Sequence, residues 1–382
     1  FNHLYLYNTE GELQSQLTQG NFVVTELYGA FGGEIYYQST EPDPRDRHVY
    51  AVSLKKNKKR KISGVSGWNS AVVSPGGRYL AHSFESAAHP GKFQILSSDG
   101  TVRQLLLQSK NPYKDAGIRL PDMEMVELQA EDGTPLYGRL IKPQNMKDGE
   151  SYPTIVYVYG GPHAQLVTNT WLGGGRLWDY YMAQRGYVVF TLDNRGSADR
   201  GKAFEEVIHR QLGKVECKDQ MTGVAWLKKQ NYVDPTRIGV HGWSFGGFMT
   251  TSLMTKHPAT FAAGVAGGPV IDWKWYEVMY GERYMDRPQE NAKGYAETSL
   301  IEKAGRLENP LLIIHGYQDD VVVPQHALEF IEACIKSGTQ VDFFLYPSHP
   351  HNVRGKDRVH LMEKITRYFD LHLKGVNGKS FR

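Results

Sequence analysis

Gly242-Trp243-Ser244-Phe245-Gly246 is the stretch that decides the fold, and it matches the pattern G-x-S-x-G. The segment before it, 237–241, is short and apolar, as a buried parallel strand is. Residues 248–257 after it have the period of a helix. A serine on such a strand-to-helix turn has its hydroxyl pushed out of the sheet, and the flanking glycines avoid collisions across the turn. We therefore predict that Ser244 is a nucleophile, with the N-terminus of the following helix favouring a developing negative charge.

A serine nucleophile needs a base and a group that orients the base. Two further buried-strand patterns follow it along the chain. One runs into the acidic pair Asp319 and Asp320, and the other runs into His349 and His351. In α/β-hydrolases the order along the chain is serine, acid, histidine. The sequence therefore predicts a triad of Ser244, one of the two aspartates and one of the two histidines, and the spacing leaves both choices open.

The residues around this triad predict an α/β fold with a doubly wound, mainly parallel sheet covered on both faces, because strand patterns alternate with helix patterns. The expected strands are 123–130, 136–141, 154–158, 188–192, 237–241, 261–266, 311–314 and 341–346. The expected helices are 177–185, 220–230, 248–257, 324–337 and 358–374.

The N-terminal residues follow a different pattern. Alternating strands at 3–7, 48–52 and 92–96 begin 45 and 44 residues apart, and each is followed by a turn and another strand. A period near 45 residues with several short strands per unit is typical of β-propeller blades. We therefore expect residues 1–118 to form about two and a half propeller blades and residues 119–382 to form the α/β-hydrolase domain. Because the chain begins in mid-pattern, we expect it to be the C-terminal part of a longer protein.

Several motifs together resemble the dipeptidyl peptidase IV branch of the prolyl oligopeptidase family, from about residue 120 to the C-terminus. These are GWSFGG at 242–247, HGxxDD at 315–320 and YGGP at 159–162. Within that branch the chain is most similar to the bacterial prolyl tripeptidyl aminopeptidases. That likeness rests on GGPVIDW at 267–273, YGERY at 280–284 and YPSHxHNV at 346–353.

The resemblance implies a serine peptidase that cleaves after proline through an acyl-enzyme and releases short N-terminal peptides. It implies Asp319 as the triad acid and His351 as the base, with the Tyr159 hydroxyl and the Phe245 backbone N–H as oxyanion donors. It implies proline-containing oligopeptides as substrates, no metal and no organic cofactor, and a periplasmic or cell-surface location in a bacterium. It leaves a homodimer open.

Three aromatic residues, Trp273, Tyr276 and Tyr280, are spaced to share one face of a helix just after the strand that ends at 266. A stripe of this kind is more often core than ligand site. A flat aromatic slot nevertheless suits a proline ring, which is compact, apolar and has no N–H to satisfy. The resemblance implies that these three residues form a proline-selective pocket with Val270 and Val322.

Two further positions bear on how many residues are released. Glu277 lies on the same expected helix and would ordinarily be an exposed carboxylate, but the resemblance implies that it binds the free amino terminus of the substrate. At Val321 the dipeptidyl peptidases have an asparagine that holds a substrate carbonyl. Valine cannot donate that hydrogen bond, so we expect release of X-X-Pro tripeptides, with release of X-Pro dipeptides as the alternative.

Composition excludes some other classes. The formal net charge of +3 on 382 residues argues against a nucleic-acid-binding protein. The two cysteines, Cys217 and Cys334, have no metal-binding or redox spacing. A broader oligopeptidase or an esterase on the same triad stays open. A non-catalytic interaction module on a hydrolase fold also stays open, although the complete set of serine, acid and histidine argues against it.

Overall fold

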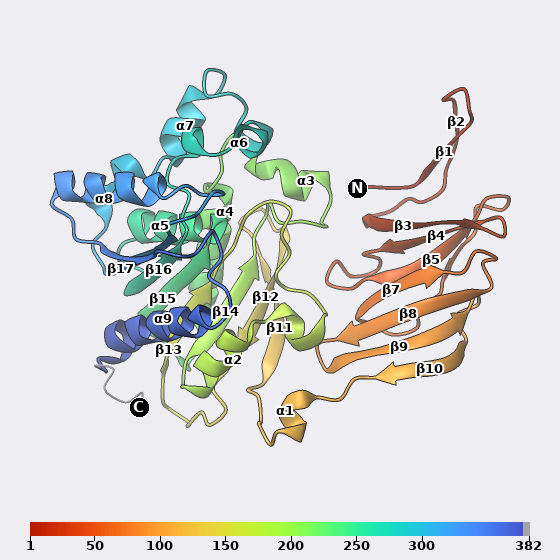
Figure 1. Cartoon of the computed structure of the whole chain (residues 1–382), viewed down its shortest axis with the longest axis horizontal. Coiled ribbons are helices and arrows are strands. Elements are labelled where there is room, and N and C mark those ends of the chain that lie inside the picture. The colour runs from red at the N-terminus through yellow and green to blue at the C-terminus, as the bar shows by residue number, and fades with distance from the viewer. Residues whose placement is uncertain (377–382) are drawn as a thin grey trace. The chain divides into compact units, whose positions relative to one another are not determined.

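The structure is a computed structural model that describes residues 1–376 (Figure 1). The chain divides into two compact units. The N-terminal unit consists of residues 1–120 together with two later segments, 165–176 and 197–205. The C-terminal unit consists of 121–164, 177–196 and the residues from 206 onward. The two later segments were not part of the predicted division at residue 118.

The N-terminal unit is built from antiparallel strands, in a hairpin and two four-stranded sheets. The hairpin pairs β1 (Tyr5–Tyr7) with β2 (Leu13–Gln16). The first sheet has the order β3 (Val24–Phe31), β4 (Glu34–Ser39), β5 (His48–Ser53), β6 (Lys59–Lys61). The second has the order β10 (Val102–Gln108), β9 (His89–Ser97), β8 (Tyr79–Ser86), β7 (Trp68–Val73). The short helix α1 (Pro112–Asp115) follows.

The three predicted repeats lie on strands β1, β5 and β9, and each strand pairs across a turn with the strand that follows it. This part of the prediction is confirmed. Side chains from both four-stranded sheets share one core, which contains Tyr36, Val49, Leu80 and Leu96. Sheets of four antiparallel strands packed in this way are what propeller blades consist of.

Arg47 shows why the two later segments belong to the N-terminal unit. Its side chain is almost fully buried, and its Nη2 donates to Asp199 Oδ2 at 2.5 Å and to Gln165 Oε1 at 3.0 Å. The guanidinium also lies 4.3 Å from the centre of the Trp68 ring. A buried cation needs such partners, and two of them come from residues 165–176 and 197–205.

The C-terminal unit is organised around an eight-stranded sheet. Its strand order is β11 (Met123–Gln129), β12 (Pro135–Ile141), β14 (Val188–Asp193), β13 (Tyr152–Tyr157), β15 (Val233–Trp243), β16 (Ala263–Gly267), β17 (Leu311–Gly316), β18 (Asp342–Tyr346). Strands β11 and β12 are antiparallel to their neighbours, and all pairs from β14 to β18 are parallel. The predicted fold class, an α/β-hydrolase with a mainly parallel sheet, is confirmed.

Helices cover both faces of this sheet (Figure 1). Helices α2 (Leu177–Gln184) and α9 (Asp357–Lys374) pack on one face, where Trp178 meets Phe369. Helices α4 (Val215–Leu227) and α5 (Phe245–Lys256) pack on the other. The remaining helices are α3 (Lys202–Glu205), which belongs to the N-terminal unit, α6 (Val278–Met285), α7 (Ala292–Thr298) and α8 (Gln325–Ser337). Short 3-10 helices span Trp171–Gly174, Glu206–Ile208, Trp273–Trp275 and Ile301–Arg306.

Two helices begin several residues earlier than predicted: α5 begins at Phe245, three residues before its expected start, and α4 begins five residues before its own. We expected a helix over 220–230, whereas α4 begins at Val215. Its first two turns bury Glu216, Asp219 and Gln220, and buried polar side chains hide the apolar period from which a helix is recognised. Among residues 1–376, no helix combines the length and the apolar character that crossing a membrane requires.

The turn from β15 to α5 brings three backbone segments unusually close together. A Cβ atom added at Gly242 would lie 2.3 Å from both the Gly246 and the Val158 carbonyl oxygens. These neighbours are main-chain atoms held by a central strand and a helix, so they cannot move aside. Only glycine fits at this position.

We therefore expect Gly242→Ala to lower the free energy of unfolding by about 3 kcal/mol or more, since overpacking against backbone forces the strand and helix apart. The matched control is Gly281→Ala in α6, where the added methyl group would meet its nearest neighbour at an ordinary 3.6 Å. Urea unfolding followed by circular dichroism measures both. Equal stability of the two variants would show that the turn can relax.

Candidate active site

Ser244 lies between the central strand β15 and helix α5, in a conformation that is rare for a residue with a side chain. Its φ is 62° and its ψ is −118°, and such strain costs about 1–3 kcal/mol. Its backbone N–H donates to the Gly267 carbonyl at 2.8 Å, which ties the turn to the end of the neighbouring strand β16. The next residue, Phe245, begins α5, so its N–H is one of the amides that a helix leaves without an internal partner.

Burial separates the two candidate acids. Asp319 is 4% exposed, whereas Asp320 is exposed to solvent. Asp319 Oδ1 accepts hydrogen bonds from the backbone N–H groups of Val321 and Val322, at 3.0 and 2.8 Å. The loop after β17 therefore wraps around the Asp319 carboxylate and fixes its orientation.

The two histidines also have different partners. His351 Nδ1 and Asp319 Oδ2 are 2.7 Å apart, whereas His349 Nε2 bonds to Asp357 Oδ2, also at 2.7 Å. Burial of Asp319 disfavours its ionised form, but hydrogen bonds from His315 and His351 outweigh that effect. They hold the pKa of the Asp319 carboxyl well below its ordinary value, so the group is an anion beside the His351 ring.

The pair formed by His351 and Asp319 lies next to the serine turn. A Cβ added at Gly268 would be 3.2 Å from His351 Cε1 and 3.5 Å from Asp319 Oδ2, and the preceding carbonyl, of Gly267, accepts the Ser244 N–H. In addition, Trp243 Nε1 donates to the His351 carbonyl at 2.9 Å. The structure thus brings the predicted serine, acid and histidine together at the carboxyl edge of the parallel strands.

Tyr159 follows β13 and lies beside the same turn. The centres of the Tyr159 and Phe245 rings are 6.1 Å apart. Burial raises the pKa of the Tyr159 phenol above its ordinary value, and the neighbouring Tyr284 adds to the shift. The Tyr159 hydroxyl therefore keeps its proton at neutral pH and can donate a hydrogen bond.

The predicted aromatic stripe is brought together, but not by the expected helix. Trp273 lies in a 3-10 helix that ends at Trp275, Tyr276 has an extended backbone, and a new helix, α6, contains Tyr280. The prediction of one helix over 273–280 was wrong, because Asp272 and Glu277 each cap a separate short helix.

The three aromatic residues nevertheless form a compact cluster. The Trp273 ring stacks on Tyr280 with ring centres 5.7 Å apart, and Tyr276 meets both rings edge-on at 5.5 and 5.2 Å. Trp273 also lies 5.3 Å from Phe245, the residue after the serine. Val270 and Val322, the other two residues predicted for this pocket, are both buried.

Glu277 is exposed and is the N-cap residue of α6. Its Oε2 accepts a hydrogen bond from the Met279 backbone N–H at 3.0 Å. The expectation that Glu277 lies on the same helix as Trp273 was therefore wrong. Its exposed carboxylate keeps an oxygen available beyond that cap contact.

Two buried histidines near the acid loop were not predicted. His315 Nε2 lies 2.7 Å from the Val322 carbonyl and 3.4 Å from Asp319 Oδ2. His326 Nδ1 accepts the Ile271 N–H at 3.0 Å, and burial lowers the pKa of His326 to about 4, so its ring is neutral. His315 stands in the HGxxDD motif, so the signal was present, but spacing gave the histidine no separate role.

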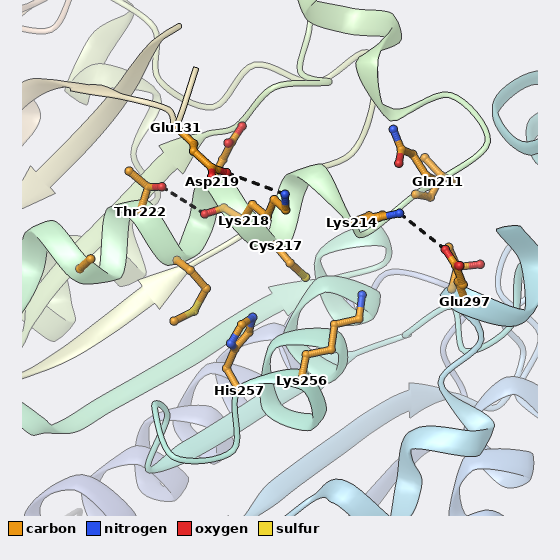
Figure 2. A pocket seen from close by; sticks show the side chains of 14 residues that line it. Glu131, Gln211, Lys214, Cys217, Lys218, Asp219, Thr222, Lys256, His257 and Glu297 are labelled. Carbon is orange, nitrogen blue, oxygen red and sulfur yellow. Dashed lines mark hydrogen bonds and ion pairs between the residues drawn. The ribbon is translucent and has the colours of Figure 1, made fainter. Parts of the chain in front are cut away.

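A large cavity lies away from this site. Its volume is about 820 Å³, and it lies between α4, the end of α5 and Glu297. Figure 2 shows the side chains that line it, among them Lys214, Cys217 and Lys256. None of the residues that line it is a predicted site residue. Burial raises the pKa of the Cys217 thiol to about 12, so Cys217 is not a reactive thiolate. Within residues 1–376 no group of three or more potential ligands could hold a metal ion.

Comparisons with known proteins agree with this arrangement. The sequence pattern of the prolyl oligopeptidase family matches residues 177–376, which is slightly more than half of the chain. The pattern of the dipeptidyl peptidase IV N-terminal region matches residues 1–91. Human dipeptidyl peptidase 8 is 29% identical over 350 residues, covering 89% of this chain and 38% of that protein.

Two solved structures are similar over most of the chain. A protein named as a candidate dipeptidyl aminopeptidase IV from Bacteroides ovatus is 46% identical, with a TM-score of 0.91 over 95% of this chain and 52% of that chain. Porphyromonas gingivalis dipeptidyl peptidase 4 is 32% identical, with a TM-score of 0.92 over 97% of this chain and 53% of that chain. The chain thus spans about half, or less, of the length of these relatives. It belongs to the prolyl oligopeptidase family of serine peptidases.

Proposed function

We propose that this protein is a serine exopeptidase that cleaves after proline and releases short peptides from the amino terminus of its substrates. One observation carries the proposal. The buried Asp319 carboxylate holds the His351 ring at 2.7 Å, next to a serine on a strained turn. A catalytic triad of the α/β-hydrolase type requires these three groups together at the carboxyl edge of a parallel sheet.

In this mechanism, His351 Nε2 takes the proton of the Ser244 hydroxyl as Ser244 Oγ attacks the carbonyl of the proline residue. Asp319 keeps the His351 ring in the required tautomer and stabilises the imidazolium. The Tyr159 hydroxyl and the Phe245 N–H donate to the oxyanion. His351 then protonates the leaving amine, and water repeats the same steps on the acyl-enzyme.

The aromatic cluster supports proline as the residue before the cleaved bond. Tyr276 and Tyr280 are partly exposed and offer aromatic surface, and the buried Trp273 packs against both rings and against Phe245. Val270 and Val322 are also buried. A proline ring in such a slot loses no N–H hydrogen bond on leaving water, so a purely apolar wall suits it. Proline-containing oligopeptides are the proposed substrates.

The number of residues released has two candidate answers. The relatives described above carry the names of dipeptidyl peptidases, which supports release of X-Pro dipeptides. Val321, whose side chain cannot donate a hydrogen bond to a substrate carbonyl, favours release of tripeptides as the second candidate. Comparing kcat/KM on X-Pro and X-X-Pro chromogenic amides decides between them. Formation of a homodimer stays a prediction, and a measurement of the particle mass in solution would test it.

The triad makes the first prediction for this function. Ser244→Ala, Asp319→Asn and His351→Ala should each lower kcat by roughly 10⁴-fold or more, because each removes one member of a unit that acts together. The matched controls are Asp320→Asn and His349→Ala. They should lower kcat by less than about tenfold, because neither residue belongs to the hydrogen-bonded pair of Asp319 and His351. An equal loss in Asp320→Asn and Asp319→Asn would refute the choice of acid.

Tyr159 gives the second prediction for this function. Tyr159→Phe removes one hydroxyl and keeps the ring, so as the loss of an oxyanion donor it should lower kcat by roughly 10²–10³-fold with little change in KM. Steady-state kinetics on a proline amide measure both constants. An unchanged kcat would leave Tyr159 a purely structural residue.

Glu277 gives the third prediction for this function. If its carboxylate binds the substrate's free amino terminus, Glu277→Gln loses a charge-assisted hydrogen bond and should raise KM roughly 10–100-fold for free-amine peptides. The same peptides with an acetylated amine have no charge to lose, so they should be almost unaffected. Glu282→Gln, on the same helix and also exposed, is the matched control. Equal losses on both kinds of substrate would mean that Glu277 supports the helix alone.

A further inference from the structure

Two buried side-chain amides lie behind the Tyr159 turn and join three separate parts of the chain. Asn194 follows β14 and Gln220 lies in α4, and both are fully buried. Gln220 Nε2 donates to the Leu192 carbonyl and to Asn194 Oδ1, both at 2.9 Å. Asn194 Nδ2 in turn donates to the Gly160 carbonyl at 3.0 Å.

The direction of these hydrogen bonds is unambiguous. Backbone carbonyls only accept, so the NH₂ group of Asn194 must face the carbonyls of Gly160 and Arg195, at 3.0 and 2.8 Å. The NH₂ group of Gln220 must likewise face the Leu192 carbonyl. Asn194 Oδ1 is then left to accept from Gln220. Donation therefore runs in one direction, from α4 through Asn194 to Gly160.

The last acceptor in this series of hydrogen bonds is the carbonyl of Gly160, which lies in the turn after β13. Gly160 has a φ of 77°, and a Cβ added there would lie 3.0 Å from Asn194 Oδ1. A Cβ added at the next residue, Gly161, would lie 2.7 Å from the Phe245 ring. The peptide that follows Tyr159 is thus held between Asn194 on one side and the serine turn on the other.

The arrangement also has an energetic cost. Gln220 Oε1 is buried and has no hydrogen-bond partner among the described residues. Burying a half-satisfied amide is unfavourable, and the NH₂ group of Gln220 offsets part of that cost by donating to the Leu192 carbonyl and to Asn194 Oδ1. What an apolar side chain could not supply is the N–H group that orients Asn194.

We propose that Asn194, oriented by Gln220, is a positioning residue that holds the Tyr159–Gly160 turn so that the Tyr159 hydroxyl stays aimed at the oxyanion. This inference rests on the proposed function of the site. A donor stabilises a transition state only when its position is fixed before charge develops, so the carbonyl of Gly160 is an effective place to act from.

Asn194→Asp tests the proposal, because it keeps the shape of the side chain and replaces the N–H donor with an oxygen that repels the Gly160 carbonyl. We expect kcat to fall roughly 10–100-fold with KM nearly unchanged, as for a catalytic group misplaced by up to 1 Å. The inhibition constant of a dipeptide boronic acid should rise by the same factor, since its tetrahedral adduct with Ser244 uses the oxyanion donors. Binding of an aminoacyl pyrrolidide, which has no carbonyl group at the position of the cleaved one, should not change.

A double-mutant cycle separates positioning from a general loss of structure. In a Tyr159→Phe background no hydroxyl is left to misplace, so Asn194→Asp should then lower kcat by less than about threefold. Gln220→Glu, which turns the donor that orients Asn194 into an acceptor, should reproduce the effect of Asn194→Asp. The matched control is Thr250→Val, which removes a buried hydroxyl that has no partner among the described residues and should leave the boronate constant unchanged.

The outcomes distinguish the two proposals. If Asn194→Asp lowers kcat equally with and without the Tyr159 hydroxyl, or leaves the boronate constant unchanged, Asn194 does not position Tyr159. The proposed function still stands in that case, provided that Ser244→Ala abolishes hydrolysis of proline amides. If Ser244→Ala leaves hydrolysis intact, the proposed function fails and the inference fails with it.

Discussion

The close approach of three backbones around the turn from β15 to α5 is the constraint on which the site depends. The Val158 and Gly246 carbonyls leave no room for a side chain at Gly242, and Ser244 is held in a strained conformation by its bond to the Gly267 carbonyl. This contact joins the three neighbouring strands β13, β15 and β16, and the Gly268 N–H extends it to β17 by donating to the Ile314 carbonyl at 2.7 Å. The serine position is therefore fixed relative to the loops after β13 and β17. The acid, the histidine and Tyr159 need only short loops to reach it, and such loops are easily kept rigid.

The sequence was most informative where chemistry and local structure impose the same pattern. The strand, the G-x-S-x-G turn and the helix around Ser244 could be predicted together, as could the order of acid and histidine along the chain. The choice between Asp319 and Asp320 could not be made from spacing, because adjacent residues share every local signal. Only the folded loop buries one carboxylate and exposes the other. The aromatic residues were found for a partly wrong reason, since two helix caps break the expected helix between Trp273 and Tyr280.

Buried polar residues account for most of what was missed. Helix α4 begins before its apolar period does because Glu216, Asp219 and Gln220 point inward. The roles of Asn194, His315 and His326 depend on partners 7 to 55 residues away along the chain, such as Gly160 for Asn194 and Ile271 for His326. A polar side chain in the core is stable only when distant segments supply its hydrogen bonds, and no local pattern records which segments will do so.

The discontinuous make-up of the N-terminal unit has a consequence for how the chain folds as it leaves the ribosome. Domains generally fold in the order in which they are synthesised. Here the first unit stays incomplete until residue 205 has emerged, because 165–176 and 197–205 are part of it. By then strands β11 to β14 of the second unit have already been made. Until Asp199 arrives, Arg47 lacks the carboxylate that neutralises it. The two units must therefore fold in overlapping periods of translation, and a pause or a stop before residue 205 would leave both of them unfinished.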